Sequence, residues 1–139
     1  MQSDFLDAHN RHLNDAETLF TNNRWANADH LYGLATECGL KRLMLALGMP
    51  FNEDEDKPVR DKDRKHADVI WRRYETYRSG HPQGTGYALP STSNPFLNWD
   101  VSQRYANQSH FDQARTEPHR NATRQVKALI SKAQREGLL

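Results

Sequence analysis

The stretch from Trp25 to Gly48 constrains the fold of this chain more than any other part of the sequence. Its apolar residues recur mostly at spacings of three and four. That spacing is the period of a helix face, whereas a half-buried strand would show a period of two. Asparagines precede the run and can cap its start, and Gly48 followed closely by Pro50 is a stop signal. We therefore expect one long helix over residues 24–48.

Three further segments show helical periodicity, at residues 4–21, 64–79 and 112–136. Only a short turn separates the first of these from the long helix, so the two are expected to lie antiparallel as a helical hairpin. No segment carries a convincing strand pattern. The sequence therefore predicts an all-α fold, a bundle of four to five helices forming one domain over residues 1–139.

Two connecting segments differ sharply in composition. Residues 51–63 alternate acidic and basic side chains and have almost nothing to bury, so we expect an exposed, mobile loop. The acidic spacing there matches no calcium-binding loop. Residues 80–111 lack a helical period but are rich in aromatic side chains, which predicts a long ordered loop before the last helix. The side chains expected to pack this loop onto the bundle are Leu89, Phe96, Leu97, Trp99, Val101 and Tyr105.

Composition limits the classes of function. Hydrophobic residues make up 36% of the 139 residues, which predicts a thin core and leaves surface for a partner. The formal net charge of +1 means that any nucleic-acid surface must be a local patch. No apolar run approaches the roughly 20 residues of a membrane-spanning helix, and the N-terminus lacks the pattern of a signal peptide. The single cysteine, Cys38, cannot form an intrachain disulfide, which favours a cytoplasmic protein with an inert buried thiol.

Glu37 and Lys41 lie four residues apart inside the long helix, with the acid on the N-terminal side. This is the favourable orientation for an ion pair on one helix face. Apolar residues flank both positions, so the pair is expected to be partly buried, with each charge needing the other. We interpret it as a structural pair.

Seven histidines raise the question of a metal site. His9 and His12 share the first helix, and Asp29 and His30 face it from the long helix. The Glu-x-x-His spacing of di-iron bundles is absent, however. We therefore predict neither a metal ion nor another cofactor, and interpret these residues as polar groups at the rim of the hairpin.

Arginine followed by histidine recurs, and this combination suits RNA cleavage. Arg104 and His110 are separated by five residues, as are Arg60 and His66, while Arg115 and His119 are separated by three. A histidine can take the proton from a 2′-hydroxyl or protonate the leaving 5′-oxygen, and an arginine can neutralise the charge growing on the phosphate. This chemistry needs no metal ion.

Four stretches taken together resemble the HEPN domain family, a group of four-to-five-helix bundles. The long helix carries the family's A-x-E-x-x-L-K-x-L type of pattern, and the first helix resembles its opening H-x-x-x-A-x-x-L. The segment from Lys65 is similar to the family's third helix, and Arg104–Tyr105 resembles the Arg-Tyr pair found before its last helix. The matching positions are Ala35, Glu37, Leu40, Lys41 and Leu43 in the long helix, and His12, Leu13, Ala16 and Leu19 in the first.

For an active HEPN protein, the resemblance implies a metal-independent endoribonuclease of a toxin–antitoxin or phage-defence system, working as a dimer. Arg104 and His110 match the spacing and the location of the family's R-x4–6-H motif and would be the catalytic pair. Arg60 and His66 match the spacing alone and are the runner-up. Basic residues of the last helix are the candidate RNA-binding groups: Arg115, Arg120 and Arg124.

One departure keeps a second function open. Active members commonly carry Asn, Asp or His directly after the motif arginine, whereas Tyr105 follows Arg104 here. Arg-Tyr also occurs in members that lack the nuclease motif. The alternative is a non-catalytic module, an accessory or antitoxin-like subunit that binds a cognate partner protein, a nucleic acid or a nucleotide.

Overall fold

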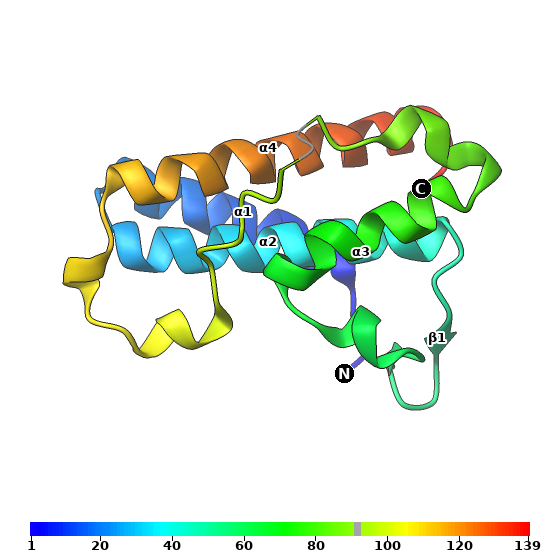
Figure 1. The fold of residues 1–139 in the computed structure, drawn as a ribbon, viewed down its shortest axis with the longest axis horizontal. Helices are drawn as coiled ribbons and strands as arrows, with labels where there is room; N and C mark the ends of the chain where they lie inside the picture. Colours follow the sequence, from blue (N-terminus) through cyan, green and yellow to red (C-terminus); the bar gives the residue numbers. More distant parts are fainter. Residues whose placement is uncertain (91–92) are drawn as a thin grey trace.

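The computed structural model describes residues 1–90 and 93–139, and the fold is all-α (Figure 1), as the sequence predicts. Ser91 and Thr92, which fall within the predicted loop 80–111, lie outside the described residues. No helix in the described part of the chain is long and apolar enough to cross a membrane. The four α-helices are α1 (Phe5–Thr21), α2 (Trp25–Ala46), α3 (Ala67–Ser79) and α4 (Gln113–Arg135).

Helix α2 is the centre of the bundle because it packs against each of the other three α-helices. Its buried residues accordingly face several sides instead of forming one stripe. The end near the α1–α2 turn forms a small apolar cluster with α1, and the other end joins α3 and α4 in the larger core. Figure 1 shows α1 and α4 running alongside α2, with α3 crossing its second half.

The ends of α2 follow from local backbone chemistry. Asn23 in the preceding turn has a φ of 58°, the left-handed conformation that asparagine tolerates better than most residues. After the helix, Gly48 has a φ of +96°, and the Met49 amide donates to the Met44 carbonyl at 2.8 Å. This is the glycine-terminated helix end that satisfies an otherwise unpaired carbonyl. The predicted stop at Gly48 thus has its expected cause.

Most residues of the segment 51–63 are exposed, in keeping with its charges, but the segment also contains regular structure and one buried aspartate. Strands β1 (Phe51–Asn52) and β2 (Lys57–Pro58) pair as an antiparallel hairpin, followed by the 3-10 helix η1 (Asp61–Arg64). The expectation of no strand is therefore wrong at this hairpin. Asp63 is fully buried, because Arg73 Nε donates to it at 2.6 Å and Tyr77 Oη at 2.5 Å. The Asp63 carboxylate can be buried because these two hydrogen bonds replace hydrogen bonds that it would otherwise make to water.

The predicted ordered loop 80–111 contains three 3-10 helices, η2 (Pro82–Tyr87), η3 (Val101–Tyr105) and η4 (Gln108–His110). Phe96 and Trp99 are buried and anchor it to the bundle. The expectation that Leu97 and Tyr105 pack inward is wrong, since they are 70% and 80% exposed. Tyr87 and Phe111 are buried as well, so aromatic rings attach the loop at several points along its described residues while Leu97 and Tyr105 face solvent.

Candidate functional site

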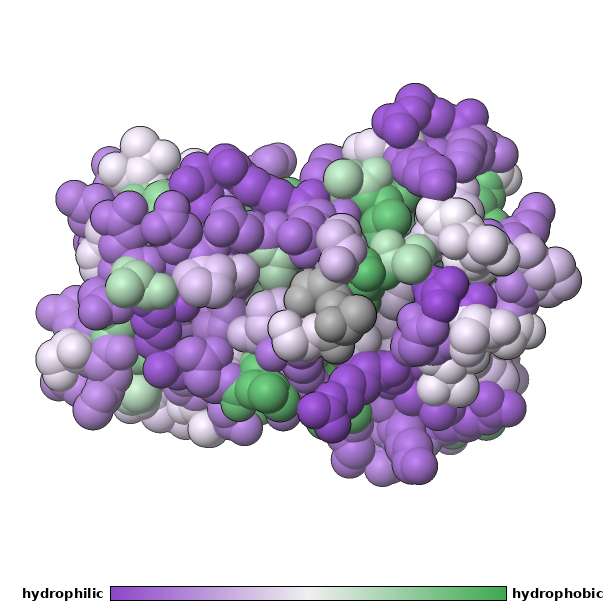
Figure 2. All heavy atoms as spheres, turned by 45° about the horizontal axis from the view of Figure 1, so that its top comes forward, coloured by the Kyte–Doolittle hydropathy of each residue, from purple (hydrophilic) through white to green (hydrophobic). Residues whose placement is uncertain are grey.

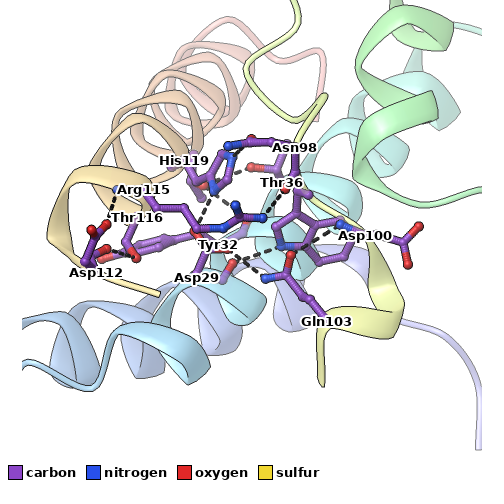
Figure 3. A network of polar contacts seen from close by, with 12 residues as sticks. Asp29, Tyr32, Thr36, Asn98, Asp100, Gln103, Asp112, Arg115, Thr116 and His119 are labelled. Carbon is purple, nitrogen blue, oxygen red and sulfur yellow. Dashed lines mark hydrogen bonds and ion pairs between the residues drawn. The ribbon is translucent and has the colours of Figure 1, made fainter. Parts of the chain in front are cut away.

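A buried carboxylate–histidine pair joins α2 to α4 beneath the loop (Figure 3). Asp29 and His119 are both fully buried, and His119 Nδ1 lies 2.5 Å from Asp29 Oδ1. His119 Nε2 lies 2.8 Å from Asn98 Oδ1, and the imidazole stacks on Phe96 at a centroid distance of 4.9 Å. Both ring nitrogens are therefore occupied, so His119 has a structural role in this arrangement.

The same aspartate holds the loop in place. Gln103 Nε2 donates to Asp29 Oδ2 at 2.7 Å, and Trp99 Nε1 donates to the Asp29 carbonyl at 3.0 Å. Arg115 donates to the carbonyl of Asn98. One buried carboxylate thus fixes η3 and α4 relative to α2. A buried charge is tolerated only with such additional hydrogen bonds, because they offset its desolvation.

A second network lies further along α2 and includes a histidine that faces solvent. Lys41 Nζ donates to Glu37 Oε1 at 2.6 Å, and His66 Nδ1 lies 3.0 Å from Glu37 Oε2. The side chains of Lys41 and Glu37 are only 7% and 12% exposed, whereas that of His66 is 45% exposed. A carboxylate only accepts hydrogen bonds, so His66 Nδ1 carries the hydrogen and Nε2 is the nitrogen left to act.

His30 follows Asp29 on α2 and contacts the loop through Trp99. Its ring stacks on Trp99 with a centroid distance of 5.7 Å and an angle of 11°. Burial lowers the pKa of His30, and the positive charge of Arg104 lowers it further, with His66 acting in the same direction. The His30 ring is therefore neutral at neutral pH. Within the described part of the chain, its buried Nδ1 has no hydrogen-bond partner.

We refer to His12, His30, Glu37, His66 and Arg104 together as the histidine face. Burial lowers the pKa of His12 as well, and the carboxylate of Glu37 acts on it in the opposite direction. The five groups come from α1, α2, the residue before α3, and η3, yet they are close enough to influence one another electrostatically. The face combines a neutral imidazole, a carboxylate-oriented imidazole and a guanidinium, which are the groups needed for proton transfer beside a phosphate.

The predicted catalytic pair is placed on the loop surface. Arg104 and His110 are both exposed, at the end of η3 and in η4 respectively. Arg104 lies over the ring of Tyr105 at 4.8 Å. No hydrogen bond or ion pair joins Arg104 to His110 among the described residues. Their meeting across a dimer interface stays a prediction.

The runner-up pair, Arg60 and His66, is divided between two networks. Arg60 donates to the Tyr77 hydroxyl at 3.2 Å, beside buried Asp63, whereas His66 pairs with Glu37. The spacing therefore does not bring these two residues together. Of the two, only His66 belongs to the histidine face.

The arginines predicted to bind RNA have partners within the chain. Arg120 donates from Nε and from a terminal nitrogen to the two Glu17 oxygens at 3.0 Å, and Arg124 donates to Glu17 at 2.7 Å. Arg115 lies 5.3 Å from the centroid of the Phe111 ring and bonds the Asn98 carbonyl. These guanidinium groups link α4 to α1 and to the loop. Fewer of their N–H donors, and less of their positive charge, are therefore available to bind a phosphate.

Neither thiol nor metal chemistry is favoured in the described part of the chain. Burial raises the pKa of the Cys38 thiol to about 12, so the thiolate required of a nucleophile is scarce at neutral pH. Among the described residues, no group of three or more His, Cys, Asp or Glu side chains could hold a metal ion.

Sequence reasoning missed the Asp29–His119 pair because the two residues are 90 positions apart. A signal was nevertheless present, since Asp29 follows the buried Ala28 and precedes Tyr32 on a core-facing part of the long helix. A charge at such a position requires a buried partner. What the chain could not reveal is which of its seven histidines supplies that partner.

Comparison of the chain with protein-family models, curated proteins and solved structures finds no match.

Proposed function

We propose that this chain is a HEPN-like, RNA-directed protein that cleaves RNA without a metal ion, in a toxin–antitoxin or phage-defence setting. The observation that carries the proposal is the half-exposed His66 held by Glu37, together with the electrostatic influence of His66 and Arg104 on the neutral His30. A histidine oriented by a carboxylate is a recurrent proton-transfer group. The likeness of the helices to HEPN domains supports RNA as the substrate.

In the proposed reaction, the 2′-oxygen of one nucleotide forms a bond to phosphorus while the bond from phosphorus to the 5′-oxygen breaks. The neutral His30 accepts the 2′-hydroxyl proton. His66 starts as the imidazolium, with Nδ1–H directed at Glu37, and donates its Nε2 proton to the 5′-oxygen. Arg104 neutralises the charge that develops on the phosphate. The products are a 2′,3′-cyclic phosphate and a 5′-hydroxyl, and proton exchange with water restores both rings.

His110 is the competing candidate for the acid–base group, on the strength of its spacing from Arg104. It is exposed and has no carboxylate partner among the described residues, so it would need a second copy of the chain to complete its surroundings. We propose a homodimer in which the exposed η3–η4 surface contributes to the RNA site, in the cytoplasm. Analytical ultracentrifugation should then give twice the chain mass, and a monomer at micromolar concentration would contradict this part of the proposal.

The decisive experiment is cleavage of tRNA and mRNA in EDTA by the wild type, His66→Ala, Arg104→Ala and His110→Ala. His81→Ala is the matched control, because His81 is a partly exposed histidine at the other end of α3. We expect cleavage by the wild type and the control, and a loss of about a hundredfold or more in His66→Ala. A larger loss in His110→Ala than in His66→Ala would reassign the acid–base group, and intact RNA with the wild type would overturn the proposal.

A non-catalytic interaction module is the second candidate, favoured by the internal pairing of the α4 arginines. Because Glu17 holds Arg120 and Arg124, the basic surface available to RNA is smaller than the sequence suggests. This function requires a stable complex with a cognate partner protein and no nuclease activity. Co-purification of a stoichiometric partner, together with intact RNA in the cleavage assay, would favour it over the enzyme.

A further inference from the structure

A cleft of about 620 Å³ lies between α3 and residues 88–89 and 93–97, and none of the residues of the histidine face is among its described lining. Its walls include Trp71, Arg72 and Glu75 from α3, with Leu89 and Leu97 from the opposite side. On the face drawn in Figure 2, apolar side chains gather in a hollow within a largely hydrophilic surface. The volume falls in the range of pockets that bind small organic molecules.

Arg72 stands out among the neighbouring arginines because it has no partner in the described part of the chain. Arg73 pairs with Asp63, and Arg78 pairs with Glu75, so both of those charges are balanced locally. Arg72, the one α3 arginine without a partner among the described residues, lines the cleft. Two arginines before α3 also have partners. Arg60 donates to the Tyr77 hydroxyl, and Arg64 donates to the carbonyls of Pro58 and Val59.

The apolar lining of the cleft is also incompletely covered. Leu97 is 70% exposed and Leu89 is half-buried, whereas Trp71 at the same cleft is only 4% exposed. Removing apolar surface from water is favourable in proportion to its area. An unpaired cation and an uncovered apolar wall therefore meet in one cleft.

We infer that this cleft binds a small organic monoanion with an aromatic or branched apolar body, of the aromatic carboxylate class. The apolar body covers Leu97 and Leu89 above Trp71, and the carboxylate accepts from the planar fork of Arg72, whose geometry suits a carboxylate. The Glu75–Arg78 pair adds no net charge, so a single negative charge balances the cleft. This inference is independent of RNA cleavage.

The test is isothermal titration calorimetry of the full chain with 1-naphthoate and with its neutral analogue, naphthalene-1-methanol. The variants are Arg72→Gln and Leu97→Ser, both at exposed positions where folding should persist, as near-UV circular dichroism can verify. Arg24→Gln is the matched control, since Arg24 is an exposed arginine in the α1–α2 turn.

We expect one naphthoate to bind per chain. Arg72→Gln should weaken naphthoate binding about tenfold, the effect of losing one charge-assisted contact, and should leave binding of the alcohol unchanged. Leu97→Ser should weaken both ligands, and Arg24→Gln neither. Absence of saturable naphthoate binding, or equal effects of Arg72→Gln and Arg24→Gln, would overturn the inference. Binding of acidic peptides in place of naphthoate would overturn it too, by assigning the cleft to a protein partner.

Discussion

Asp29 makes three kinds of contact from one buried position. One carboxylate oxygen meets His119, the other accepts from Gln103, and the backbone carbonyl accepts from the Trp99 indole. Because His119 belongs to α4 whereas Gln103 and Trp99 belong to the loop, the residue acts as a junction between α2, α4 and the loop. Removing the carboxylate therefore leaves a cavity and takes a hydrogen-bond partner from both His119 and Gln103.

We expect Asp29→Ala to lower the free energy of unfolding by about 3–5 kcal/mol, the usual cost of removing one partner of a buried pair. Urea denaturation at pH 7 measures the change. Asp15→Ala on the exposed face of α1 is the control and should alter stability by no more than about 0.5 kcal/mol. Similar small effects for both variants would show that the Asp29–His119 contact does not support the fold.

Glu17 makes the free energy of unfolding depend on pH in the acidic range. Burial acts to raise its pKa, but hydrogen bonds from Arg120, Arg124 and Tyr32 outweigh burial and lower the pKa of Glu17 from 4.5 to about 2. A lowered folded-state pKa contributes stability above pH 4.5, and that contribution is lost as the pH falls toward 2. Allowing for solvent screening of this partly exposed group, we expect Glu17→Gln to cost about 1 kcal/mol at pH 6.

Urea denaturation of the wild type and Glu17→Gln between pH 2 and pH 6 tests this dependence. The two proteins should differ most near pH 6 and converge as the pH falls toward 2, where about half of the wild-type carboxyl groups are protonated. A difference that stays constant over this range would show that the ionised form of Glu17 contributes nothing to stability.

At the scale of elements, α2 and the loop 93–111 are fitted to each other at Gly33. A methyl group at this position would overlap the indole of Trp99, which packs directly on the helix. Glycine inside a helix normally costs about 1 kcal/mol relative to alanine. Its presence here allows the buried ring to approach the backbone.

We therefore expect Gly33→Ala to destabilise the protein by about 1–3 kcal/mol, the range for overpacking a core, although helix propensity alone would favour alanine. Thermal unfolding measures the direction. Because Trp99 also stacks on His30, the same variant should shift the tryptophan emission and reduce RNA cleavage. An unchanged or raised melting temperature would contradict this packing.

Local patterns were sufficient to predict the helices, because their spacing and stop signals act over a few residues. The cap after α2 is one such case, since Gly48 and Pro50 stand next to the residues they terminate. The 51–63 segment could not be predicted in this way. Asp63 resembles its charged neighbours in sequence and differs only in having Arg73 and Tyr77 as partners across the fold.

Individual residues of the candidate site could be predicted from the sequence, but their grouping into one site could not. Arg104, His66 and Glu37 were each identified from sequence, the first two in R-x5-H spacings and the last as part of a structural pair. Their grouping depends on how α2 meets η3 and the start of α3, which no local pattern specifies. Spacing therefore associated His66 with Arg60, whereas the fold associates it with Glu37.

At the scale of the whole molecule, three helices and the loop converge on the histidine face. Helix α2 supplies His30 and Glu37, and the loop held by Asp29 carries Arg104, whose positive charge acts on His30. Stability and the candidate chemistry thus share one scaffold: the Asp29 network fixes the loop, while Nε2 of the half-exposed His66 has no hydrogen-bond partner among the described residues. Substitutions in the Asp29 network should reduce activity by displacing the loop that carries Arg104. Substitutions of His66 should reduce activity while the protein stays folded.

The measurement that tests the central claim most directly is mass spectrometry of the RNA ends produced by the wild-type protein in EDTA. The substrate is an RNA oligonucleotide, with an all-2′-deoxy version of the same sequence as control. Metal-independent attack by the 2′-oxygen predicts 2′,3′-cyclic phosphate and 5′-hydroxyl ends from the RNA, and an intact control. Intact RNA, or cleavage of the deoxy control at the same rate, would contradict it.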